Sequence, residues 1–107
     1  MRDTRLLVLV SVAAGPRHGY GIQRDLEACF GYRPGPGTLY GAISALEEAG
    51  LIEADHPVGR RRPYRLTPAG RRELERRVIE LRSVVQAAVP RLAARSGGGA
   101  ALDGATT

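Results

Sequence analysis

The sequence lacks several residue types on which whole classes of protein depend. Of its 107 residues only one is cysteine, Cys29, and none is tryptophan. A single cysteine excludes an internal disulfide and is typical of a reducing compartment. One cysteine and two distant histidines supply no ligand cluster of the kind that binds zinc. We therefore expect no metal site and no cofactor.

Long apolar runs are also missing. The apolar run near the N-terminus is five residues long, Leu6 to Val10. A membrane span requires about 20 apolar residues, and the apolar region of a signal peptide requires about 7–15. We therefore expect neither of these segments, and the sequence favours a cytoplasmic protein.

Lysine is absent, so arginine carries the whole excess of positive charge. The 16 basic residues are all arginine, and the formal net charge is +5. Arginine suits planar contacts to phosphate and guanine, although a GC-rich genome would give the same usage. Residues 57–66 contain four arginines and no acidic residue. This block indicates a polyanionic partner; a solvated loop is the alternative.

Motifs for catalysis are missing as well. The sequence has no nucleophile–base pairing, P-loop or dinucleotide fingerprint. Cys29 falls on the apolar side of a predicted helix, which favours a small core residue over a redox switch. An enzyme is thus the least favoured class.

The pattern of apolar residues predicts three short helices, a hairpin and a long helix. The helices cover residues 4–14, 19–30 and 38–49, and the strands cover 51–55 and 63–66. Thr67 and Pro68 are a typical helix start. Pro63 lacks a backbone donor, so we expect the second strand to lie at an edge. The predicted fold is mainly α with a small β-hairpin: a winged helix-turn-helix over residues 1–67, a C-terminal dimerisation helix over 68–95 and a flexible tail over 96–107.

The last helix carries an apolar seam that its own chain has no element left to cover. The spacing 4, 3, 4, 3, 4 is sustained over nearly three heptads by Leu74, Val78, Leu81, Val85, Ala88 and Leu92. Pro90 is expected to bend or end this helix. The economical partner is a second copy of the chain, so we predict a homodimer whose interface contains Leu74, Val78, Leu81, Val85 and Leu92.

Three motifs in order resemble the PadR family of bacterial transcriptional regulators. The first is Gly15-Pro16-Arg17-His18-Gly19-Tyr20, and the second is Pro36-Gly37-Thr38-Leu39-Tyr40. The third is Gly59-Arg60-Arg61-Arg62-Pro63-Tyr64-Arg65-Leu66-Thr67. The resemblance covers about residues 5–92 and is similar to the short members, which have one C-terminal helix.

The resemblance implies a dimeric winged-helix repressor that binds double-stranded DNA at a palindromic operator. Many members are released from DNA by small aromatic or drug-like ligands. Some relatives stack planar ligands on a tryptophan at the dimer interface, and this chain has none. That mode of ligand binding does not carry over.

The third predicted helix is the candidate for the major groove. Thr38, Tyr40 and Ser44 lie on its outward face, where they can reach phosphates or base edges. The alternatives are that Tyr40 packs against the second helix and that Thr38 only caps its own helix. Residues from the second helix and the hairpin complete the predicted DNA-binding set: His18, Tyr20, Gln23, Arg60, Arg61 and Arg62. A purely structural turn is the alternative for the His18 segment, and Tyr64 is expected in the core.

Two further hypotheses concern partners. The first helix is more apolar than a three-helix core demands, so we expect a candidate effector pocket between it and the last helix of the other subunit. Its lining would include Leu6, Val10, Val85 and Val89. The rival to a DNA-binding repressor is a winged-helix adaptor whose arginines meet an acidic protein surface.

Overall fold

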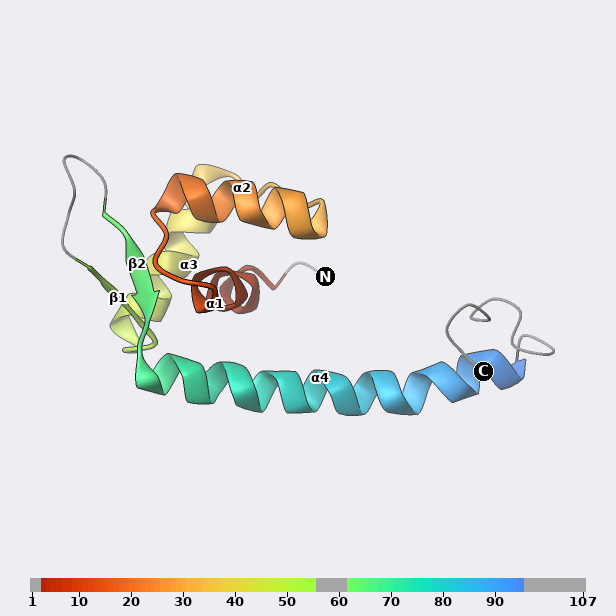
Figure 1. Cartoon of the computed structure of the whole chain (residues 1–107). Coiled ribbons are helices and arrows are strands. Elements are labelled where there is room, and N and C mark those ends of the chain that lie inside the picture. The colour runs from red at the N-terminus through yellow and green to blue at the C-terminus, as the bar shows by residue number, and fades with distance from the viewer. Residues whose placement is uncertain (1–2, 56–61, 96–107) are drawn as a thin grey trace. The chain divides into compact units, whose positions relative to one another are not determined.

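The computed structural model describes residues 3–55 and 62–95 of the chain. The elements are α1 (Thr4–Ala13), α2 (Gly19–Phe30), α3 (Pro36–Glu48), β1 (Ile52–Ala54), β2 (Tyr64–Leu66) and α4 (Pro68–Arg95) (Figure 1). This is the predicted order, and each predicted bound lies within two residues of the observed one. The mainly helical winged-helix architecture is therefore confirmed.

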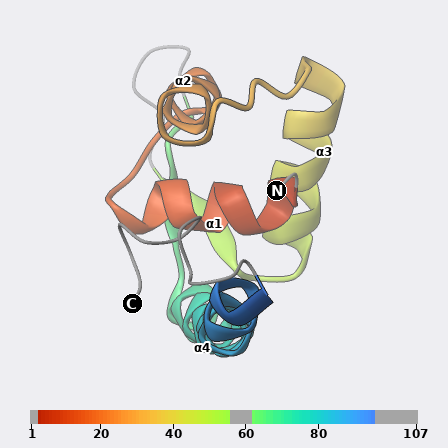
Figure 2. The ribbon, with the colours of Figure 1, turned by 90° about the vertical axis from the view of Figure 1, so that its right-hand side faces the viewer.

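Helix α1 is the centre of the domain. It contacts α2, α3 and β2, and Figure 2 shows it below α2 with one end against α3. The four consecutive residues from Leu6 to Leu9 are all buried. Four neighbours in sequence point in all directions around a helix, so this turn of α1 is covered on every side. This central position explains why the helix is so apolar, without any second subunit.

The core is built from one face of each surrounding element. Each buried aliphatic side chain contributes roughly 1.5–3 kcal/mol, and the main contributors around α1 are Ile22, Leu26, Leu39, Ile43, Leu46, Ile52 and Tyr64. The predicted inward face of α3 and the buried position of Tyr64 are confirmed. The prediction that Cys29 is a core residue is wrong: Cys29 is exposed, and the adjacent Phe30 is 45% exposed. The core covers the turns with Ile22 and Leu26, and the last turn of α2 extends past it.

The hairpin is held on both sides. Ile52 pairs with Leu66 and Ala54 pairs with Tyr64 in an antiparallel register. β2 is an edge strand of this two-stranded sheet, as predicted, and at Tyr64 an isolated bridge to Arg17 lies on its other side. The Tyr64 amide donates to the Arg17 carbonyl over 2.8 Å, and the Arg17 amide donates to the Tyr64 carbonyl over 3.0 Å. The segment before α2 is thereby tied to the hairpin.

The first turns of α4 are built into the same domain. The Thr67 hydroxyl accepts from the Gly70 amide over 3.0 Å, which confirms the predicted cap, and it donates to the Gly50 carbonyl over 2.6 Å. Gly70 is in close contact with the backbone of Leu51: a methyl group added there would lie 2.9 Å from the Leu51 carbonyl carbon and closer still to its oxygen. Leu74 packs against the core.

The chain divides after Glu75 into two compact units, so the rest of α4 is described by itself. Pro90 is expected to bend or end the helix, and it does not end it, because α4 runs through Pro90 to Arg95. Proline removes a backbone donor from the helix ladder, and beside it the Arg91 guanidinium donates to the Ala87 carbonyl over 3.1 Å. Within the described ranges, no helix is long and apolar enough to cross a membrane.

Candidate nucleic-acid interface

Helix α3 presents a row of polar side chains on its outer face. Thr38, Tyr40 and Ser44 are exposed, whereas Leu39 and Ile43 are buried. The helix begins at Pro36 with Gly35 as its cap and without a side-chain cap hydrogen bond. Thr38 thus stands in the first turn and does not cap α3, which excludes the structural alternative for this residue. The outer face is open to a partner.

Tyr40 is both exposed on the outer face of α3 and packed against α2, the two alternatives drawn from the sequence. It is 47% exposed, yet its ring lies against the backbone of Gly19 at the start of α2. Tyr64 stands close by on the core side. Burial raises the pKa of the Tyr64 phenol, and the neighbouring Glu47 and Tyr40 raise it further. Tyr40 is therefore anchored along one side of its ring and open on the other.

The first turn of α2 is a rigid unit. His18 caps the helix: its Nδ1 accepts from the Gly21 amide over 3.3 Å, and its carbonyl accepts from the Ile22 amide over 3.0 Å. Gln23 is occupied in the fold, because its Nε2 donates to the Pro34 carbonyl over 2.9 Å and so fixes the α2–α3 connection. Tyr20 is 56% exposed. Of the three residues predicted here, Tyr20 has the most surface available to a partner.

The arginine-rich hairpin is described only in part. Arg62 is exposed at the start of the returning chain. Arg60 and Arg61 lie outside the described residues. Arg65 projects from β2 and forms an ion pair with Glu53 on β1, so its charge is partly neutralised.

Two arginines that the sequence reasoning missed lie next to the predicted residues. Arg24 stands one turn after Tyr20, with its guanidinium 5.7 Å from the centre of the Tyr20 ring; the spacing of four could have indicated this pair. Arg5 is exposed at the start of α1 and lines a shallow hollow with Thr38 and Gly41 of α3. Only the tertiary fold brings these two helices together.

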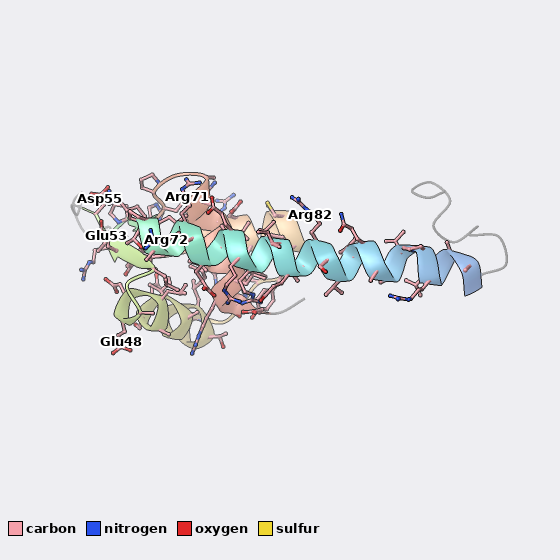
Figure 3. The ribbon with its side chains drawn as sticks, turned by 90° about the horizontal axis from the view of Figure 1, so that it is seen from below. Glu48, Glu53, Asp55, Arg71, Arg72 and Arg82 are labelled. Atoms are coloured by element: carbon pink, nitrogen blue, oxygen red, sulfur yellow. The ribbon has the colours of Figure 1, made fainter. Side chains whose placement is uncertain are left out.

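The hairpin and the first turns of α4 show a different charge pattern. Figure 3 shows Glu53 on β1, Asp55 just after it, Glu48 at the end of α3, and Arg71 and Arg72 on α4. Acidic and basic side chains are mixed there, which does not favour a polyanion. The first three turns of α3, in contrast, contain no acidic residue.

The predicted seam of α4 is largely exposed. Val78, Val85 and Leu92 are 41%, 56% and 59% exposed, whereas Leu74 is shared with the core of its own domain. Two apolar residues outside the seam, Ile79 and Val84, are also exposed. Val84 lines a shallow apolar hollow with Ala87, Ala88, Arg91 and Leu92.

The residues of the predicted effector pocket differ in solvent exposure. Leu6 is only 2% exposed, whereas Val10 is 38% exposed. Val89 on α4 is half-buried. Because Leu6 is already packed inside one chain, a ligand could reach it only if α1 moved. No group of three or more His, Cys, Asp or Glu side chains in the described parts of the chain is arranged to hold a metal ion.

Comparison with known proteins identifies related sequences. Residues 8–76 match the model of the transcriptional regulator PadR-like family. The chain is 43% identical over 81 residues to the transcriptional regulator Rv3488 of Mycobacterium tuberculosis, an alignment that covers 71% of this chain and 75% of that protein. It is 50% identical over 74 residues to an uncharacterized 37.1 kDa protein in a Streptomyces fradiae transposon. That alignment covers 69% of this chain and 21% of the transposon protein.

Solved structures share the fold. A PadR family transcription regulator from Clostridium difficile superposes with a TM-score of 0.76 at 22% identity, covering 83% of this chain and 97% of that one. PadR of Bacillus subtilis, solved in complex with operator DNA, superposes with a TM-score of 0.66 at 21% identity, covering 73% of this chain and 48% of that one.

Proposed function

The chain belongs to the PadR-like family of transcriptional regulators, and on that premise we propose that it is a repressor that binds a palindromic DNA operator as a homodimer. Membership in a family of regulators assigns control of transcription to the chain rather than catalysis. The Bacillus subtilis relative binds operator DNA, which supports the same partner here.

The outer face of α3 carries the proposal. It offers Thr38, Tyr40 and Ser44 to a partner while the opposite face of the helix is packed into the core. Hydroxyl groups and an aromatic ring are suited to phosphates, base edges and thymine methyl groups. The absence of acidic residues from the first three turns of α3 avoids repulsion of the DNA backbone. We infer that α3 reads bases in the major groove.

The basic residues around α3 supply the remaining contacts. Arg62 begins the chain that returns from the hairpin tip, and Arg24 lies one turn after Tyr20 on α2. We infer that the hairpin arginines, including Arg60 and Arg61, bind phosphates or the minor groove, where arginine is favoured. These contacts give affinity that depends on salt and hardly on sequence.

The exposed seam of α4 supports the homodimer. Val78, Val85 and Leu92 repeat at the spacing of a coiled-coil seam and stay exposed in one chain. Two copies pairing through α4 would bury these residues and set the distance between the two half-sites. We infer that a small aromatic or drug-like ligand between the subunits changes this distance, with Val10, Val85 and Val89 in contact with it.

DNA titrations test the proposal. The full chain is mixed with labelled duplexes from the region upstream of its own gene and with shuffled duplexes, and fluorescence anisotropy is followed across a salt series. We expect tight binding of one upstream duplex. Tyr40→Phe is expected to weaken that binding by up to about tenfold per half-site, because one hydrogen bond to a base edge of the operator contributes roughly 0.5–1.5 kcal/mol. It should leave the shuffled duplex unaffected.

Arg62→Ala is the contrasting variant. It should weaken both duplexes together and reduce the slope of log affinity against log salt by about 0.9 for each phosphate that the arginine neutralises. If the chain binds heparin but no upstream duplex in preference to its shuffled form, an adaptor with an acidic protein partner replaces the repressor.

A further inference from the structure

Tyr40 on α3 rests on a position of α2 that has no side chain. Gly19 is the first residue of α2 and is buried. A methyl group added to Gly19 would lie 2.6 Å from Cζ of Tyr40 and 2.8 Å from its Cε1, and closer still to the phenol oxygen. Carbon atoms in contact are normally about 3.5–4.0 Å apart. Tyr40 can therefore occupy this place only because residue 19 is glycine.

The neighbouring glycines show that this contact is specific. At Gly21, two residues further along α2, the nearest atom to an added methyl group is Cε1 of His18 at 3.7 Å, an ordinary contact. At Gly41, next to Tyr40 on α3, an added methyl group meets nothing within 4 Å. Among these three glycines, only Gly19 is required by the position of another side chain.

The surface under the Tyr40 ring is itself fixed. His18 caps α2 through both its Nδ1 and its carbonyl, and the preceding Arg17 is paired with Tyr64 of the hairpin by two backbone hydrogen bonds. The ring is thus held on a backbone with little freedom, while nearly half of its surface faces outward. A side chain that is ordered before binding loses less conformational entropy when it binds.

We propose that Gly19 is a positioning residue for DNA recognition. Its missing side chain leaves the space in which the Tyr40 ring packs where α2 and α3 meet, so that the phenol faces the operator in one orientation. The inference rests on the proposed function, in which Tyr40 contacts each half-site. Gly19 itself touches no DNA and acts only through Tyr40.

Gly19→Ala tests this, with Gly21→Ala as the matched control. Both substitutions add one methyl group to the first turn of α2, but only the first displaces Tyr40. We expect Gly19→Ala to weaken operator binding about tenfold per half-site, as Tyr40→Ala does, and Gly21→Ala to change it less than about twofold. Affinity for shuffled DNA and the salt slope should stay unchanged in both variants.

The double variant Gly19→Ala/Tyr40→Ala separates positioning from folding. If Gly19 acts through Tyr40, adding Gly19→Ala to Tyr40→Ala causes no further loss of affinity. It also relieves the clash, so any thermal destabilisation of Gly19→Ala should disappear in the double variant. Crystal structures of Gly19→Ala and Gly21→Ala should show the ring displaced only in the first.

Three outcomes would overturn the inference. One is operator binding by Gly19→Ala equal to that of the unmodified chain while Tyr40→Ala binds poorly. Another is the same loss of affinity from Gly19→Ala with and without Tyr40, which would place the effect in the α2 backbone. The third is normal operator binding by Tyr40→Ala. If the unmodified chain shows no preference for any upstream duplex, the proposed function fails before the variants are compared.

Discussion

Residues 3–75 and residues 76–95 both carry apolar side chains at helical spacing, but the two regions place them in opposite surroundings. In the first region Leu39, Ile43 and Leu46 are buried within one chain. In the second, Val85 and Leu92 are more than half exposed. An aliphatic side chain left in water forgoes roughly 1.5–3 kcal/mol. The first region is complete by itself, whereas the second lacks a covering partner.

The second region also contains exposed ion pairs. In the second region Glu80 lies between two arginines, 2.6 Å from Arg76 and 3.7 Å from Arg77. Such exposed pairs contribute only about 0.3–0.5 kcal/mol each, and isolated helices are marginal in water. Salt bridges therefore do not replace the missing apolar packing, and we infer that stability in this region depends on protein concentration.

The largest expected effect is the loss of the dimer. Glutamate at both Leu81 and Val85 would place two charges per chain in the proposed seam, with a loss of at least roughly 1.5–3 kcal/mol for each apolar side chain removed. We expect monomers in light scattering and a lower helix content in circular dichroism. The matched control, Ser83→Glu with Gln86→Glu, adds the same two charges at exposed positions outside the seam and should remain dimeric. A double variant at Leu81 and Val85 that stays dimeric would place the interface elsewhere.

The next effect concerns the first turn of α4, which lies within the first region. Gly70→Ala would force a methyl group against the Leu51 backbone, which cannot rotate away as a side chain can. Overpacking of this kind costs about 1–3 kcal/mol. We expect a lower midpoint in chemical denaturation of the winged-helix region. Gly41→Ala, which meets nothing within 4 Å, should instead raise stability by about 0.5–1 kcal/mol; equal effects of the two substitutions would contradict the close approach of Gly70 to Leu51.

The sequence predicted the fold well because its signals are local. Helical spacing located Leu39, Ile43 and Leu46 on the inward face of α3, and Thr67 with Pro68 marked the start of α4. It failed where packing decides. The spacing of Cys29 and Phe30 matches that of Ile22 and Leu26, but the core ends before the last turn of α2.

The candidate site was predictable only in its outline. The outward positions of Thr38 and Tyr40 follow from periodicity. The close approach of Tyr40 to Gly19, and of Arg5 to Thr38, depends on how two helices cross. The hydrogen bond from the Gln23 side chain to the Pro34 carbonyl also depends on tertiary structure, because Pro34 lies in the connection between α2 and α3. No spacing within one helix contains that information.

A smaller effect compares basic residues in the two regions. Arg24→Ala should reduce the slope of log affinity against log salt by about 0.9 for one phosphate left without its arginine, or about 1.8 for a dimer. Operator and shuffled duplexes should be affected alike. Arg82→Ala removes the same charge from the second region (Figure 3) and should leave the slope nearly unchanged. Anisotropy titrations at several salt concentrations measure both, and equal slopes would exclude Arg24 from the DNA-binding surface.

The smallest effect lies at the end of α2, where the first region leaves predicted core residues exposed. The Cys29 thiol donates to the Asp25 carboxylate over 3.4 Å. This hydrogen bond raises the pKa of the thiol above its ordinary value of 9.0; desolvation and the charge of Asp25 raise it further, against a lowering by Arg17. The thiolate is the reactive form. Cys29 should therefore react with iodoacetamide more slowly at pH 8 than an unperturbed cysteine does.

Asp25→Asn should speed this alkylation at pH 8, because the substitution lowers the pKa of the Cys29 thiol. The control is Glu27→Gln, which removes an acidic group paired with Arg33 rather than with the thiol and should leave the rate unchanged. The raised pKa means that the folded state stabilises the protonated thiol. This contribution to stability is present below pH 9.0 and is lost as the pH rises through the pKa of the folded state. The alkylation rates of the unmodified chain and Asp25→Asn should converge above that pKa, where both thiols are ionised. Equal rates for the unmodified chain and Asp25→Asn at pH 8 would show that Asp25 does not hold the proton of the thiol.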